Sequence, residues 1–154
     1  MLRTLILITA LLTSMAAHAS DPQAIFSAEK KADFETTYQA VYKSLEDNKF
    51  FVVFEPDIGA SVGRFGKNWD NYNQNKLERI KSMVFCNGWL ANKMSNADPK
   101  FLALCPLRLT MTHKQGVTTV LFVRPDFVAK GSKAEAVAKE ITQGVIEAIE
   151  VGMK

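Results

Sequence analysis

The chain has 154 residues, with 19 lysines and arginines against 16 aspartates and glutamates, which gives a formal net charge of +3. This near balance argues against a nucleic-acid partner, because phosphate binding needs clustered lysines and arginines. The length is that of one ordinary domain with a substantial hydrophobic core.

The first 19 residues have the pattern of a cleavable export signal. Arg3 supplies a short positive region, an almost unbroken apolar run follows over residues 5–12, and residues 17–19 form a small-x-small cleavage site. The apolar run is too short to span a hydrocarbon layer of roughly 30 Å. Cleavage after Ala19 leaves 135 residues (154 − 19) with a net charge of about +2. We therefore expect a single periplasmic or secreted domain, 20–154, without a stable membrane anchor.

The N-terminal half predicts a strand, a helix and a second strand. Phe26 begins a short first strand, and residues 33–48 form a helix, with Asp33 as its N-cap and Asn48 ending it in the left-handed conformation. Four apolar residues recur at helical spacing on one face: Phe34, Tyr38, Val41 and Leu45. Aromatic and β-branched residues over 50–55 predict a strand buried on both faces.

Residues 59–74 are predicted to form a long irregular loop, because glycine and asparagine recur throughout. Loops of this length are commonly functional. Trp69 and Tyr72 lie within it, and we favour the interpretation that both rings fold back as a lid on the core. The alternative is a recognition loop in which the two rings contact a ligand.

The C-terminal half predicts three further strands and two helices. A strand over 82–86 leads to a short helix over 89–94, and clean alternation over 107–113 predicts a strand that forms a hairpin with residues 117–124. A capping box from Ser132 to Glu135 opens the last helix. Its buried face carries Val137, Ile141, Val145 and Ile149. The order of elements predicts an α+β fold, a largely antiparallel sheet with two main helices packed on one face.

The two cysteines form the first candidate site. Cys86 ends one strand and Cys105 precedes another, and two cysteines of an exported protein form a disulfide more often than not. Such a bridge would stabilise the fold by roughly 3 kcal/mol on the chain-entropy model. Free buried thiols and a redox-active pair are the alternatives, with Arg108 as the nearest cation in sequence. A metal site that adds His113 is not expected, because an extended strand would place it over roughly 20 Å from Cys105.

Asn87, Trp89 and Arg108 are candidate pocket residues. A simpler interpretation, which we favour, is that Asn87 caps the short helix and Arg108 pairs with a carboxylate. The sequence contains no His-Glu-x-x-His pattern, and a lone His113 cannot by itself make a triad, so we predict no catalytic residue, no metal and no cofactor. The favoured function is a non-enzymatic module that binds a small molecule or a protein. The alternative is a thiol redox or soft-metal-handling protein that uses Cys86 and Cys105.

Three segments together resemble the domain of unknown function 302 family. They are the helix start at 33–36 with the strand that follows at 48–55, the Phe-Cys-Asn of 85–87 with Ala-Asp-Pro at 97–99, and residues 104–109 with their hairpin. The resemblance implies a small α+β domain with a TATA-binding-protein-like shape, often assembled as a homodimer. It implies no particular activity.

Overall fold

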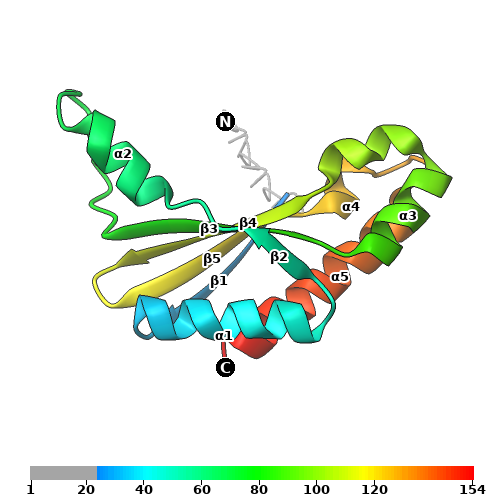
Figure 1. The fold of residues 1–154 in the computed structure, drawn as a ribbon, viewed down its shortest axis with the longest axis horizontal. Coiled ribbons are helices and arrows are strands. Elements are labelled where there is room, and N and C mark those ends of the chain that lie inside the picture. Colours follow the sequence, from blue (N-terminus) through cyan, green and yellow to red (C-terminus); the bar gives the residue numbers. More distant parts are fainter. Residues whose placement is uncertain (1–23) are drawn as a thin grey trace, which may run out of the picture.

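The structure is a computed structural model that describes residues 24–154, so the predicted export signal and its cleavage site lie outside the described residues. A five-stranded sheet with the order β1-β5-β4-β3-β2 forms the centre, and every strand pair in it is antiparallel (Figure 1). Its strands are β1 (Ile25–Lys31), β2 (Phe51–Phe54), β3 (Arg79–Cys86), β4 (Leu107–Lys114) and β5 (Val117–Val123).

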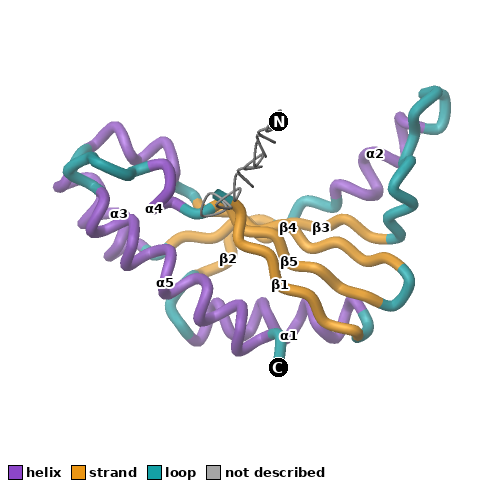
Figure 2. The backbone as a smooth tube through the Cα atoms, turned by 180° about the vertical axis from the view of Figure 1, so that it is seen from behind, coloured by secondary structure: helices purple, strands orange, loops and turns teal. Residues whose placement is uncertain are grey.

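The two long helices lie on one side of this sheet. The helices of the described chain are α1 (Phe34–Asp47), α2 (Ile58–Gly66), α3 (Gly88–Ala97), the 3-10 helix η1 (Pro99–Leu104), α4 (Pro125–Val128) and α5 (Glu135–Gly152). Figure 2 shows the two long helices α1 and α5 beneath the strands, whereas α2 projects from the opposite side. The expected α+β fold, with two main helices packed on one face of an antiparallel sheet, is confirmed.

The core lies between α1, α5 and the covered face of the sheet. Tyr38 and Leu45 from α1 meet Val145 and Ile149 from α5, and all four side chains are fully buried. Alternate strand residues complete the core: Met83, Phe85, Leu109, Met111, Val120 and Phe122. Each large apolar side chain buried in this way contributes roughly 1.5–3 kcal/mol relative to an exposed one.

The opposite side of the sheet, which we call the open face, is not covered by α1 or α5. Because successive side chains of a strand point to opposite faces, the buried Leu109 and Met111 place Arg108 and Thr110 on the open face. Figure 1 shows α2 rising on one side of this face and α4 with η1 on the other. Helical segments therefore border the open face on two opposite sides (Figure 1).

We expected residues 59–74 to form an irregular loop throughout, and that prediction is wrong for the first part of the segment. Ile58–Gly66 is helix α2, capped by Asp57, whose Oδ1 accepts a hydrogen bond from the amide of Ala60 at 2.7 Å. Three glycines hide the helical pattern because glycine disfavours a helix interior by up to about 1 kcal/mol. The Asp57 cap was the signal that could have revealed it. Turns follow from Lys67 to Asn75.

Strand β2 is an edge strand, and the prediction that it is buried on both faces is wrong. The side chains of Phe51, Val53 and Phe54 are 51%, 65% and 62% exposed. Apolar composition favours a strand, but it does not determine whether that strand lies at the centre or at the edge of a sheet. Glu46 covers part of this edge, because its carboxylate accepts a hydrogen bond from the amide of Val52 at 2.7 Å.

Two helix ends also differ from the prediction. Asn48 has φ −90°, and Lys49, one residue later, takes the left-handed conformation with φ 65°. Helix α5 begins at Glu135 rather than after Ser132. The Ser132 hydroxyl accepts from the amide of Ala134, and the Glu135 carboxylate accepts from the amide of Gly131, so both act in the preceding turn.

Candidate functional site

The antiparallel pairing of β3 with β4 brings the two cysteines together. Cys86 is the last residue of β3, and Cys105 lies between η1 and β4, where the chain returns from its excursion through α3. Their Sγ atoms are 3.4 Å apart, and both thiols are free and half-buried. This contact is close enough for one thiol to donate a hydrogen bond to the other.

The surroundings of Cys105 hold its thiol in the protonated form. Burial, followed by the hydrogen bond and the charge of Cys86, raises the pKa of Cys105 to about 11. A reactive thiolate needs the opposite effect, a pKa lowered by nearby positive charge. The electrostatics therefore favour a structural pair over a nucleophilic one.

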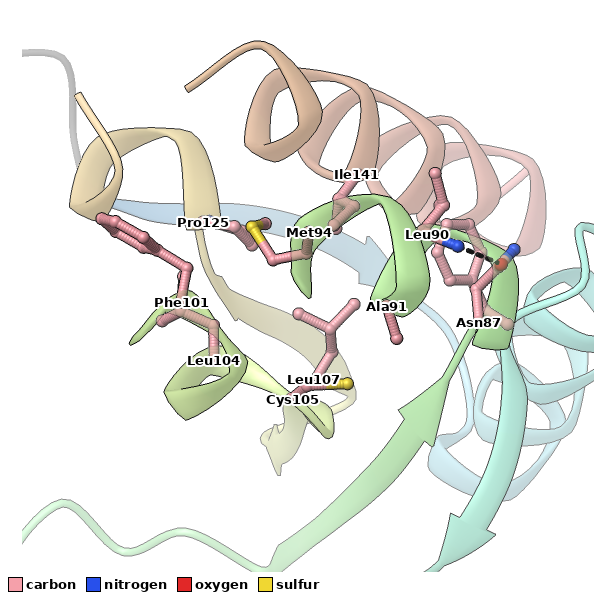
Figure 3. A pocket seen from close by; sticks show the side chains of 11 residues that line it. Asn87, Leu90, Ala91, Met94, Phe101, Leu104, Cys105, Leu107, Pro125 and Ile141 are labelled. Carbon is pink, nitrogen blue, oxygen red and sulfur yellow. Dashed lines mark hydrogen bonds between the residues drawn. The ribbon is translucent and has the colours of Figure 1, made fainter. Parts of the chain in front are cut away.

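A small apolar cavity lies behind Cys105 (Figure 3). Helix α3 supplies Leu90 and Met94 to its walls, and η1 supplies Phe101 and Leu104. The cavity measures about 20 Å³, which is room for about one water molecule. It is a gap in the packing between α3, η1 and α5 and is too small for an organic ligand.

The structure separates the three predicted pocket residues. The Asn87 Oδ1 accepts a hydrogen bond from the amide of Leu90 at 3.0 Å, so Asn87 caps α3 as the simpler interpretation required. Trp89 is 69% exposed on α3. Arg108 lies on the open face, and no carboxylate in residues 24–154 forms an ion pair with it, so the carboxylate partner we predicted is wrong for this part of the chain.

Trp69 and Tyr72 lie on the arm, by which we mean residues 58–77. Trp69 is 57% exposed and Tyr72 is 39% exposed, and neither belongs to the core, so the favoured lid interpretation is wrong. Both rings rest against Gly66 at the end of α2. A methyl group built on Gly66 would lie 2.5 Å from Tyr72 Cδ2 and 3.1 Å from Trp69 Cε3. The missing side chain of Gly66 therefore admits both rings.

A hollow of about 380 Å³ lies between the arm and β3, and we call it the arm hollow. It is lined by Gly59, Val62, residues 71–75, Leu77, Glu78 and Ile80. The Asn73 side chain exchanges two hydrogen bonds with the backbone of Leu77, and Gln74 Nε2 donates to Asn71 Oδ1 at 2.8 Å. These bonds fix the turn that carries Tyr72. Sequence reasoning identified the two rings and missed the amides and Glu78, because it did not place the arm beside β3.

His113 lies far from the thiol pair, near the opposite end of β4. Its Nδ1 shares a hydrogen bond with Thr118 Oγ1 at 2.9 Å, and its Nε2 is 3.7 Å from Glu78 Oε2. Among the described residues, no three His, Cys, Asp or Glu side chains lie close enough together to hold a metal ion. None of the helices in that part of the chain is both long and apolar enough to cross a membrane.

Comparison with known proteins gives a family and a fold. No curated protein matches the sequence. An uncharacterized conserved DUF302 protein of Bacillus stearothermophilus, solved by crystallography, superposes with a TM-score of 0.72 over 82% of this chain and 96% of that one, at 13% identity. At that identity the likeness shows the fold alone. The model of the family described as domain of unknown function DUF302 matches residues 26–151. The chain therefore belongs to the DUF302 family.

Proposed function

We propose that this protein is an exported, non-enzymatic binding module and that its binding site is the arm hollow together with Trp69 and Tyr72. One observation carries the proposal: two exposed aromatic rings are held against Gly66, and one of them, Tyr72, also lines a hollow of about 380 Å³. Exposed aromatic clusters mark interaction sites. The volume falls within the range of small-molecule pockets, roughly 300–1,000 Å³.

The lining of the arm hollow favours a polar, uncharged ligand. Asn71, Asn75 and the Tyr72 ring contribute polar groups, and Glu78 is the one charged residue among those that line it. Glu78 is itself occupied, because its Oε1 accepts from the amide of Gln115 at 3.1 Å. Amide groups beside aromatic rings suit a ligand with many hydroxyl groups and an apolar face, such as an oligosaccharide.

The test uses tryptophan fluorescence, because the chain has only two tryptophans. Trp89→Phe leaves Trp69 as the single reporter, and a panel of neutral oligosaccharides is titrated into this variant. A saturable change that is absent in Trp69→Phe, where Trp89 reports, supports the proposal. Alanine at both Trp69 and Tyr72 should abolish binding without a loss of fold. Unfolding of that double variant, or no saturable change with any sugar, would overturn it.

A second candidate function rests on the 3.4 Å contact between the two thiols. We propose as the alternative that the Cys86 and Cys105 thiols give two electrons and two protons to an external disulfide, which is reduced to a dithiol while the pair forms a disulfide. Mass spectrometry of protein from the periplasm, alkylated before and after mild reduction, tests this alternative. A pair that cycles under mild reductant promotes it, as does bound copper or zinc in the purified protein. A bridge that resists mild reductant leaves a structural disulfide.

Export and assembly are also part of the proposal. The signal pattern of residues 1–19 supports cleavage after Ala19, and the family resemblance supports a homodimer. Intact-mass analysis of the exported protein should give Ser20 as the first residue. Light scattering should return twice the chain mass. A mass below 17.1 kDa, that of the full chain, would contradict the dimer.

A further inference from the structure

We infer that the open face binds a single-chain anionic amphiphile, with its acidic head group on Arg108 and its apolar tail in the hollows beside that residue. The ligand class is that of a fatty carboxylate. This inference does not depend on the arm hollow, which lies at another part of the molecule.

A row of residues crosses all five strands on the open face. Strand pairing places Phe54 opposite Val84, Val84 opposite Arg108, and Val123 opposite Ile25. The register of β4 and β5, extended by one residue from Leu109 and Phe122, places Arg108 opposite Val123. We call this set the crossing row. It consists of one arginine with two apolar residues on each side.

The crossing row is exposed although four of its five members are apolar. Phe54, Val123 and Ile25 are 62%, 44% and 49% exposed. Contiguous exposed apolar surface is typical of ligand-binding grooves and interaction sites. The guanidinium group of Arg108 has five fixed donors that match a carboxylate or phosphate, and no carboxylate in residues 24–154 pairs with it.

Two hollows meet at Arg108. One, of about 290 Å³, runs toward η1 and is walled by Leu104, Pro106 and Pro125. The other, of about 260 Å³, runs along β5 toward β1. Arg108 and Val123 line both hollows, and Arg108 is the one charged residue in either lining. The site therefore offers one cation between two largely apolar hollows, which matches a ligand with one anionic group and an alkyl chain.

The same features argue against other occupants. A polyanion such as nucleic acid needs several cations along its path, and the crossing row has one. A second copy stacked on this face would have to supply a carboxylate to Arg108. Alternation along β1 puts Glu29 on the open face, and it already accepts a hydrogen bond from Thr119 Oγ1 at 3.4 Å. A monomeric amphiphile brings its own counter-charge.

The experiment is calorimetric titration of the exported protein with sodium dodecanoate below its micelle concentration. We expect saturable binding at one site, at least tenfold weaker in Arg108→Gln. Val123→Asp, which puts a negative charge into both hollows, should abolish binding. Lys114→Gln is the matched control, since it removes one positive charge at the far end of the same strand and should leave binding unchanged. Dodecyl maltoside, which has the same tail and no charge, should bind at least tenfold more weakly.

Three results would overturn the inference. The first is equal dodecanoate affinity in the native protein and in Arg108→Gln, which would mean that the arginine only covers apolar surface with its stem. The second is binding to phosphatidylglycerol vesicles without binding to monomeric dodecanoate, which would indicate a membrane surface. The third is a halving of the mass in light scattering on Val123→Asp with no dodecanoate binding to the native protein, which would assign this face to a second copy. Alanine at Trp69 and Tyr72 should leave dodecanoate binding intact, so failure of the arm-hollow proposal is distinguishable.

Discussion

Gly152 of α5 lies directly against the backbone of Val41 in α1. A methyl group built on Gly152 would be 2.6 Å from Val41 Cα and 2.9 Å from Val41 N. Both residues are buried, and Val41 is fully so. The two long helices therefore touch here through backbone atoms, with no side chain between them.

This contact predicts that Gly152→Ala destabilises the protein. The new methyl meets rigid backbone, so α5 must shift, and we expect a loss of about 1–3 kcal/mol in the free energy of unfolding, the usual cost of overpacking. Urea denaturation measures it. Gly88→Ala is the control, because nothing lies within 4 Å of its added methyl, and it should change stability by less than about 1 kcal/mol. An unchanged midpoint for Gly152→Ala would show that the last turn of α5 moves aside freely.

The hydrogen bond of Tyr38 leads us to expect a loss of stability at alkaline pH. Its hydroxyl donates to Glu55 Oε2 at 2.6 Å, and burial, followed by the hydrogen bond and charge of Glu55, raises the pKa of Tyr38 above its usual 10.0. The unfolded phenol therefore ionises first. The contribution of Tyr38 is fully present below pH 10 and falls as the pH rises beyond it. Tyr38→Phe should cost about 1–2 kcal/mol at pH 7. That difference should shrink above pH 10, as measured by urea denaturation against pH.

The control for this titration is Tyr42→Phe, which removes a phenol from the same helix at a partly buried position. Parallel curves for the native protein and Tyr38→Phe above pH 10 would mean that Tyr38 ionises as readily when folded as when unfolded.

The thiol pair predicts a pH dependence that differs between the reduced and oxidised protein. The pKa of Cys105 is raised from 9.0 to about 11, so in the reduced protein its contribution to stability is fully present below pH 9 and is lost as the pH rises toward 11. A disulfide has no proton to lose. The unfolding midpoint of reduced protein should therefore fall more steeply between pH 9 and pH 11 than that of oxidised protein. Serine at both cysteines should abolish the difference.

We expect Gly66→Ala to displace aromatic rings of the arm without unfolding the domain. The added methyl would collide with Tyr72 Cδ2, so the Tyr72 ring must leave its position and the Trp69 ring, also close, must shift. Because neither ring belongs to the core, the free energy of unfolding should change by less than about 1 kcal/mol. In the Trp89→Phe background, the emission maximum of Trp69 should move. A large loss of stability with unchanged emission would show that the arm supports the fold instead.

Elements with strong local patterns were predictable from the sequence. The helical spacing of Phe34 and Tyr38 gave α1, and the alternation from Leu107 to His113 gave β4, because side-chain periodicity reports directly on a covered face. The cap formed by Asn87 was also predictable, since the amide of Leu90 needs a partner close in sequence.

Features that depend on long-range placement were not predictable. The edge position of β2 is set by which strands pair, and the sequence of Phe51 does not contain that information. Trp69 packs against Gly66 instead of the core, and this contact exists only in the folded arm. The apolar neighbours of Arg108 come from β3 and β5, so a reading of β4 alone suggested a carboxylate partner instead.

The open face has a consequence for the evolution of the family. Along β4, the core residues Leu109 and Met111 alternate with Arg108 and Thr110, whose side chains lie on the open face outside the core. Substitutions at the second kind of position change surface chemistry at little cost in stability. A domain whose two long helices cover one face of the sheet can therefore acquire new binding partners by changing one half of its strand residues, while the other half preserves the architecture.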